Sequence, residues 1–193
     1  MPDMQLVRVE ATLLAPLQIT AELHLDSLLA AVHPAMHGEM KPARCDTSAR
    51  AIRVAPLPLC QAKCDGEWVW ACTAAQFPET VVASSSTITR RKDPNDVFAA
   101  QRVYSPSSGP DKDRMMTSMV LQAPTVHWCA VTRDIQEVRR LLRRVKHVGG
   151  LRKCGYGAVA KWTVEPAGGE LNRVLIEDCV AMRRLPTSFC SRW

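Results

Sequence analysis

The sequence predicts an α+β fold built as one domain. Short stretches in which apolar and polar residues alternate are typical of half-buried strands, and two other stretches have the apolar spacing of an amphipathic helix. A chain of 193 residues is long enough to bury one core but short for two. We therefore expect a single domain over residues 1–193, with an insertion at about residues 83–118.

The chain begins with a predicted strand and a short predicted helix. Apolar and polar residues alternate from Val7 to Leu13, which indicates a strand, and its continuation through residues 17–21 is open. Apolar residues at positions 25, 28, 29 and 32 then share one helical face. Because Pro34 cannot continue a helix, we expect the helix to end before it.

Residues 52–74 predict a hairpin. Asp65-Gly66 supplies the turn, and Trp68, Trp70 and Cys72 fall on one face of the returning strand. We expect the two tryptophans to face the core.

The insertion at residues 83–118 differs in composition from its surroundings. It combines a serine run, the basic run Arg90–Lys92 and a segment rich in Ser, Pro, Gly and Asp. These residues predict a mobile element rather than core. A flexible loop and a hairpin are both consistent with them.

The second half of the chain predicts a strand, a helix and two further strands. The strands are expected at residues 126–131, 158–164 and 174–182. Asp134 with Glu137 predicts the capped start of the helix, which we expect to reach Gly149-Gly150. Its apolar stripe comprises Ile135, Val138, Leu141, Leu142, Val145 and Val148. The element order is that of a ferredoxin-like fold with a C-terminal strand addition, and other α+β layouts remain open.

The most basic stretch of the chain leads into a glycine-rich loop. Seven cations in residues 139–153 suit a polyanion whose phosphates contact several cations at once, although cations near a helix C-terminus also complement its dipole. Glycines at positions 149, 150, 155 and 157 permit close approach of a ligand backbone, but a helix-to-strand turn alone would also explain the first two. The loop lacks a Gly-Lys-Ser/Thr ending and follows a helix, so it is not a nucleotide phosphate loop.

These residues resemble a known family. The pattern Gly149, five residues, Gly155-Tyr156-Gly157 is similar to the glycine-rich loop of the RAMP superfamily of CRISPR-associated RNA-binding proteins. Residues 16–30 and 87–96 are similar to the small RAMP subunit of type IV CRISPR effector complexes. The resemblance extends over most of residues 5–165.

The resemblance implies a subunit that caps the 5′ repeat-derived handle of a guide RNA. Its implied neighbours are the backbone RAMP subunits and the large subunit of the CRISPR complex. By analogy with related complexes, the target nucleic acid is expected to be a DNA duplex, which would lie nearby at the short motif that flanks the target. With the cationic stretch, the predicted RNA-binding residues are Arg90, Arg91, Lys92, Arg102, Arg139, Arg140, Arg143, Arg144, Lys146, His147, Gly149, Gly150, Arg152, Lys153, Gly155, Tyr156 and Gly157. Tyr104 and Tyr156 are candidates for stacking on an unpaired base.

We expect binding without catalysis, and no cofactor or metal. The alternative is a guide-processing ribonuclease that uses His24 or His147 as its proton carrier. A third hypothesis is a zinc-stabilised module around Cys60 and Cys64, which lack a second ligand pair at finger-like spacing. The remaining histidines, His33, His37 and His127, are no stronger candidates for a catalytic role. Acidic residues near the N-terminus and the lack of a long apolar run predict a cytoplasmic protein that does not enter membranes.

Overall fold

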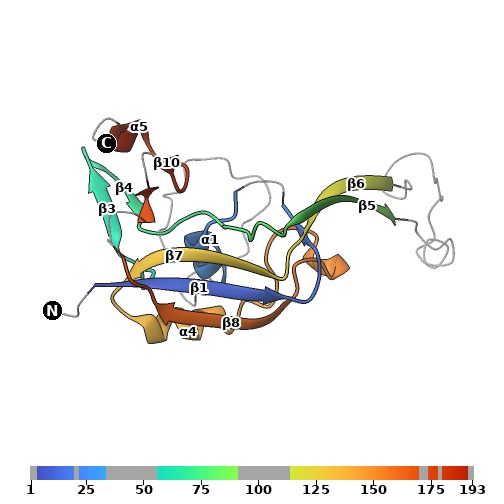
Figure 1. Cartoon of the computed structure of the whole chain (residues 1–193), viewed down its shortest axis with the longest axis horizontal. Helices are drawn as coiled ribbons and strands as arrows, with labels where there is room; N and C mark the ends of the chain where they lie inside the picture. The colour runs from blue at the N-terminus through green and yellow to red at the C-terminus, as the bar shows by residue number, and fades with distance from the viewer. Residues whose placement is uncertain are drawn as a thin grey trace, which may run out of the picture.

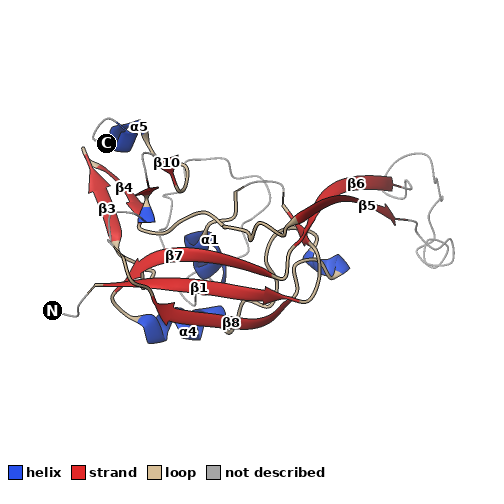
Figure 2. Cartoon of the chain, viewed as in Figure 1, coloured by secondary structure: helices blue, strands red, loops and turns tan. Residues whose placement is uncertain are grey.

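A computed structural model describes residues 4–19, 22–33, 56–90, 114–169, 174–177 and 180–190. Strands predominate, they pair in antiparallel fashion, and a few short helices accompany them (Figure 2). This arrangement confirms the α+β class. Among the described residues, no helix is long and apolar enough to cross a membrane.

Three antiparallel strands form the central sheet (Figure 1). Strand β1 (Gln5–Leu13) lies between β7 (Thr125–Thr132) and β8 (Val159–Pro166), close to the three predicted strands. Alternate residues of β1 and β7 are fully buried, as the sequence alternation requires, among them Val7, Val9, Ala11, Val126, Trp128 and Ala130. On their other face, Arg8, Glu10 and Thr12 of β1 are polar, whereas Leu6 and Val131 pack into a second, smaller apolar cluster.

Two eight-residue helices cover the buried face of this sheet. Helix α1 (Leu25–Val32) contributes Leu25 and Leu29, and α4 (Ile135–Leu142) contributes Val138, Leu141 and Leu142 to the same core. The cap of α4 is confirmed, because the Asp134 carboxylate accepts a hydrogen bond from the Glu137 N–H at 2.9 Å.

Helix α4 ends at Leu142, so the prediction of a helix reaching Gly149 is wrong. Residues beyond it turn tightly, with the Arg144 N–H donating to the Leu141 carbonyl at 3.0 Å. Residues 146–148 then pair with the start of β8: the Val159 N–H donates to the Lys146 carbonyl at 3.0 Å. Backbone groups used in this pairing cannot also extend a helix. Val145 and Val148 are nevertheless buried, because the turn keeps them on the core side.

An irregular segment at residues 71–76 lies along the free edge of β7. The Thr73 N–H donates to the Cys129 carbonyl at 2.9 Å, and Gln76 exchanges two backbone hydrogen bonds with His127. This segment occupies the position of a fourth sheet strand, giving the spatial order 71–76, β7, β1, β8.

The predicted hairpin before this segment is confirmed as β3 (Gln61–Cys64) and β4 (Glu67–Trp70). Asp65 and Gly66 connect them with φ angles of 48° and 84°, as a tight two-residue turn requires. The prediction that both tryptophans face the core is wrong for Trp68, which is 37% exposed. Trp70 is half-buried against the core.

A second hairpin projects away from the central sheet (Figure 1). Strand β5 (Val82–Arg90) pairs with β6 (Arg114–Gln122) in unbroken register, and the short β2 (Leu17–Gln18) pairs with the base of β6. Of the two expectations for the insertion, the hairpin is correct at its base. Residues 83–90 and 114–118 pair with one another through their backbones, so these residues form regular strands rather than an irregular loop. Residues 91–113 lie outside the described residues.

The C-terminal region does not form the single strand predicted at residues 174–182. It contains the short pair β9 (Ile176–Glu177) and β10 (Val180–Ala181), followed by α5 (Thr187–Cys190). The chain reverses here, since the Met182 N–H donates to the Leu175 carbonyl at 2.8 Å.

The residue after this reversal reaches the core. The Arg183 guanidinium lies 3.2 Å from the Asp26 carboxylate at the start of α1, and both side chains are largely buried. Arg183 also donates to the Trp70 carbonyl at 2.9 Å and to the Cys72 sulfur at 3.1 Å. Burial raises the pKa of the Cys72 thiol to about 12, so this cysteine is held as a neutral core residue.

Candidate nucleic-acid interface

The glycine-rich loop runs from Gly149 to Gly157 and contains a single turn of 3-10 helix, η2 (Arg152–Cys154). Its two ends are fastened to the segment that carries β2. The Gly150 N–H donates to the Gln18 carbonyl, and the Gly157 N–H donates to the Pro16 carbonyl, both at 2.8 Å. Between these anchors the loop bulges into solvent, so that Arg152, Lys153, Cys154 and Gly155 are exposed.

Three of the four loop glycines serve the protein's own packing. A Cβ at Gly149 would lie 2.5 Å from the Gln18 carbonyl oxygen, one at Gly150 would overlap the Gln18 side chain, and one at Gly157 would overlap the Val148 carbonyl. The close approach that the sequence suggested for RNA is therefore occupied at these positions by the chain itself. Gly155 differs, because its φ of 85° demands glycine while nothing lies near its Cα.

Tyr156 connects the loop to the projecting hairpin. Its hydroxyl forms a hydrogen bond with the Ser86 hydroxyl of β5, and both side chains are half-buried. Tyr156 thus has a structural role, which is to tie the loop to β5, and this role competes with the predicted stacking of its ring on a base. Sequence reasoning did not single out Ser86 or Gln18 as site residues, because both lie far in the sequence from the glycine-rich loop that they contact.

The tie between Tyr156 and Ser86 gives a stability prediction. Replacing Tyr156 with Phe, or Ser86 with Ala, should each lower the free energy of unfolding by roughly 0.5–1.5 kcal/mol. The double variant should lose little more than either single, because both changes remove one bond. Urea denaturation measures all three, with Ser85→Ala on the opposite, exposed face of β5 as the control. Additive losses would contradict a direct bond.

The seven cations of residues 139–153 divide into two groups. Arg139 donates to the Val164 carbonyl at 2.6 Å, and Arg140 makes two hydrogen bonds of 2.6 Å to Glu137, whose pKa they lower. The other five are exposed, and none of them pairs with a carboxylate in the described part of the chain. These five, the free cation group, are Arg143, Arg144, Lys146, Arg152 and Lys153.

Several predicted site residues fall elsewhere. His147 is half-buried within the basic stretch, and its backbone pairs with Ala158 at the start of β8. The backbone of Arg90 ends β5 opposite Arg114. The other residues predicted from the insertion, Arg91, Lys92, Arg102 and Tyr104, lie outside the described residues.

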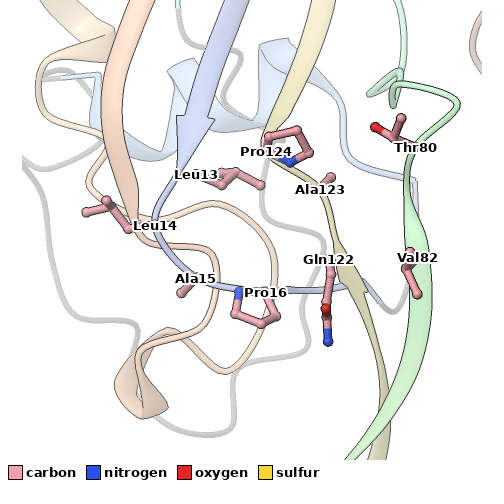
Figure 3. Close-up of a pocket in the computed structure, with 9 residues that line it drawn as sticks. All are labelled: Leu13, Leu14, Ala15, Pro16, Thr80, Val82, Gln122, Ala123 and Pro124. Carbon is pink, nitrogen blue, oxygen red and sulfur yellow. The ribbon is translucent and has the colours of Figure 1, made fainter.

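A shallow cavity of about 430 Å³ lies beside the segment that anchors the loop. Figure 3 shows Leu14 and Pro16 on one side of it, with Val82 and Gln122 of the hairpin base on the other. Among the described residues, none with a charged side chain lines it. The cavity therefore does not suit a phosphate.

Besides His147, three of the candidate histidines lie within the described residues. The His24 side chain is 3.3 Å from the Glu22 carboxylate at the start of α1, and burial, with Arg183 nearby, lowers its pKa. The pKa of His127 is likewise lowered, by burial and by Arg8. His33 directly follows α1 as its C-cap, and His37 lies outside the described residues.

The described cysteines do not assemble a metal centre. Cys60 and Cys64 are buried, and no group of three or more His, Cys, Asp or Glu residues within the described ranges is placed to hold a metal ion. Cys45 and Cys179 lie outside those ranges.

The family comparison decides the identity of the chain. A family model described as CRISPR type IV associated protein Csf3 matches residues 5–105, more than half of the sequence. The chain belongs to the Csf3 family. This confirms the type IV CRISPR relationship inferred from the sequence. The match extends from β1 into the projecting hairpin and ends before the glycine-rich loop, so the loop is a feature of this Csf3 protein that the family match does not itself cover.

Other comparisons add little to the Csf3 assignment. No curated protein matches. One similar chain occurs in a cryo-EM structure of the type III-B Cmr-beta bound to cognate target RNA, with 10% sequence identity and a TM-score of 0.42. The alignment covers 86% of this chain and 62% of that one, so this chain spans less than two thirds of its length.

Proposed function

We propose that this Csf3 protein is a non-catalytic guide-RNA-binding subunit of a type IV CRISPR ribonucleoprotein, and that it caps the 5′ repeat-derived handle. The observation that carries the proposal is the free cation group, which lies partly within the anchored loop and partly in the residues before it. Five exposed cations that have no carboxylate partner within the described ranges create a local excess of positive charge, which the phosphates of a single strand complement. Membership of a type IV CRISPR family supports a guide RNA as the proposed ligand.

The core is proposed to be ferredoxin-like. The order of β1, α1, segment 71–76, β7, α4 and β8 along the chain, and their spatial order in the sheet, support this fold. The polar face of the sheet is a poor RNA platform, because Arg8 pairs with Glu10 at 3.2 Å and Lys161 shares this face with Glu165. We therefore place the RNA at the loop rather than on the sheet.

The proposed assembly role follows from the projecting hairpin and the family. The proposed neighbours of this subunit are the backbone RAMP subunits and the large subunit of the complex. It is also proposed to contact target DNA near the short motif that flanks the target. Sequence reading would be left mainly to base pairing by the guide.

Removing two loop cations tests RNA binding directly. Arg152→Ala with Lys153→Ala should weaken binding of the repeat-derived handle RNA and reduce the steepness of log affinity against log salt by about 1.4, since each lost phosphate contact contributes about 0.7. Fluorescence anisotropy at several salt concentrations measures both quantities.

The matched control removes the same formal charge elsewhere. Arg8→Ala with Arg184→Ala replaces two cations that are each paired with a glutamate away from the loop, at 3.2 and 3.1 Å. This control should keep the wild-type salt slope. Equal losses in the two double variants would refute a localised site.

The same RNA distinguishes binding from cleavage. Incubation without divalent metal should leave the handle RNA intact, because the proposal assigns no proton carrier at the loop. Site-specific cutting that disappears in His147→Ala or His24→Ala protein would establish the ribonuclease alternative instead.

A further inference from the structure

One face of the β3–β4 hairpin presents aromatic and cationic side chains together. Cross-strand register places Gln61 opposite Trp70 and Lys63 opposite Trp68, so that these four side chains share a face. The two indole rings meet edge to face with centroids 5.3 Å apart. Trp68, Lys63 and Gln61 are exposed, whereas Trp70 is half-buried and fixes the arrangement to the core.

A cavity of about 340 Å³ lies beside this face and is also cationic. Its rim includes Lys63 of β3 and Arg133, which follows β7. No carboxylate lines it, and neither cation forms an ion pair within the described residues. The acidic residues of this hairpin lie elsewhere, with Asp65 in the turn and Glu67 on the opposite face of β4.

We propose that this face, the tryptophan platform, binds an unpaired nucleotide of single-stranded nucleic acid. An exposed indole offers a stacking surface that every base can use, and the two cations lie where a backbone phosphate can be neutralised. The Gln61 amide adds a donor and an acceptor for a base edge. A purely apolar protein partner fits less well, because it would leave Lys63 and Arg133 without counter-charge.

The platform is a second nucleic-acid contact, separate from the glycine-rich loop. Strands β3 and β4 lie at the end of the molecule opposite the projecting hairpin, whose β5 contacts the loop through Ser86 (Figure 1). The proposal goes beyond handle capping and does not require it, since any unpaired strand could occupy the platform.

Two variants of the full chain test the platform. Binding of a labelled oligouridylate of about twelve nucleotides, a length within reported single-strand site sizes, is measured by anisotropy. Trp68→Leu keeps an apolar side chain but removes the ring, and it should weaken binding roughly tenfold, the contribution of about one stacked base. Lys63→Gln with Arg133→Gln retains both rings and should flatten the salt dependence.

The measurements are repeated in protein that also carries Arg152→Ala and Lys153→Ala. The platform changes should still reduce oligouridylate binding in this background. The oligonucleotide should quench the tryptophan fluorescence of the parent protein, and this quenching should be largely lost in Trp68→Leu protein. Affinities within twofold of the parent in both platform variants would overturn the proposal in favour of a protein neighbour for Trp68. Failure of the loop variants alone would affect only the handle-binding function, so the two proposals fail separately.

Discussion

Replacing Arg183 with methionine should lower the free energy of unfolding by about 3–5 kcal/mol, the usual cost of removing one partner of a buried ion pair. The Asp26 carboxylate is only 14% exposed and would be left without its counter-charge. The same change removes hydrogen bonds to the Trp70 carbonyl and the Cys72 sulfur. Urea denaturation followed by circular dichroism measures the loss.

The neighbouring Arg184 provides a matched control. It also pairs with a glutamate, Glu22 at 3.1 Å, but its side chain is 81% exposed. Arg184→Met should therefore cost at most about 1 kcal/mol. Asp26→Leu combined with Arg183→Met should regain part of the lost stability, because it leaves no unpaired buried charge. An Arg183→Met loss no larger than that of Arg184→Met would show that the buried pair does not hold the C-terminal region to the core.

Gly157→Ala should be the most damaging change in the loop, with a loss of about 3 kcal/mol. Its φ of 62° costs an L-residue about 1–2 kcal/mol, and the overlap of the new Cβ with the Val148 carbonyl adds an overpacking cost of about 1–3 kcal/mol. Denaturant unfolding of the purified variant gives the value.

Gly155→Ala isolates the backbone contribution. Gly155 has a similar positive φ of 85° but open space around its Cα, so its substitution should cost only about 1–2 kcal/mol. Equal losses at the two positions would mean that the Val148 carbonyl moves aside and that packing against residues 16–18 does not dictate the glycine at position 157.

Sequence reasoning succeeded where a local pattern carries the information. Helix α1 and the cap of α4 follow from side chains three or four residues apart, and the β3–β4 turn follows from Asp65-Gly66. It failed where a distant partner decides. Segment 71–76 lacks a regular strand pattern and is ordered by β7, more than fifty residues away in the sequence.

The candidate site shows the same division. The density of cations in residues 139–153 is visible in the sequence, but only the structure separates Arg139 and Arg140, which have partners, from the five that pair with no carboxylate in the part of the chain that the structure describes. The loop glycines are also visible in the sequence, but the sequence does not show why glycine is required at these positions. Gly149, Gly150 and Gly157 are dictated by Pro16–Gln18 and Val148.

By itself the sequence determined the α+β class, the main core strands, both core helices and the basic stretch, because periodicity and charge density are properties of neighbouring residues. Only the tertiary structure decided the early end of α4, the tie of Tyr156 to Ser86, the exposure of Trp68 and the burial of Arg183 against Asp26. Each of these depends on which distant backbone or side-chain group arrives to satisfy a hydrogen bond, a charge or an apolar surface. A pattern of neighbouring residues contains no information about which distant group will make that contact.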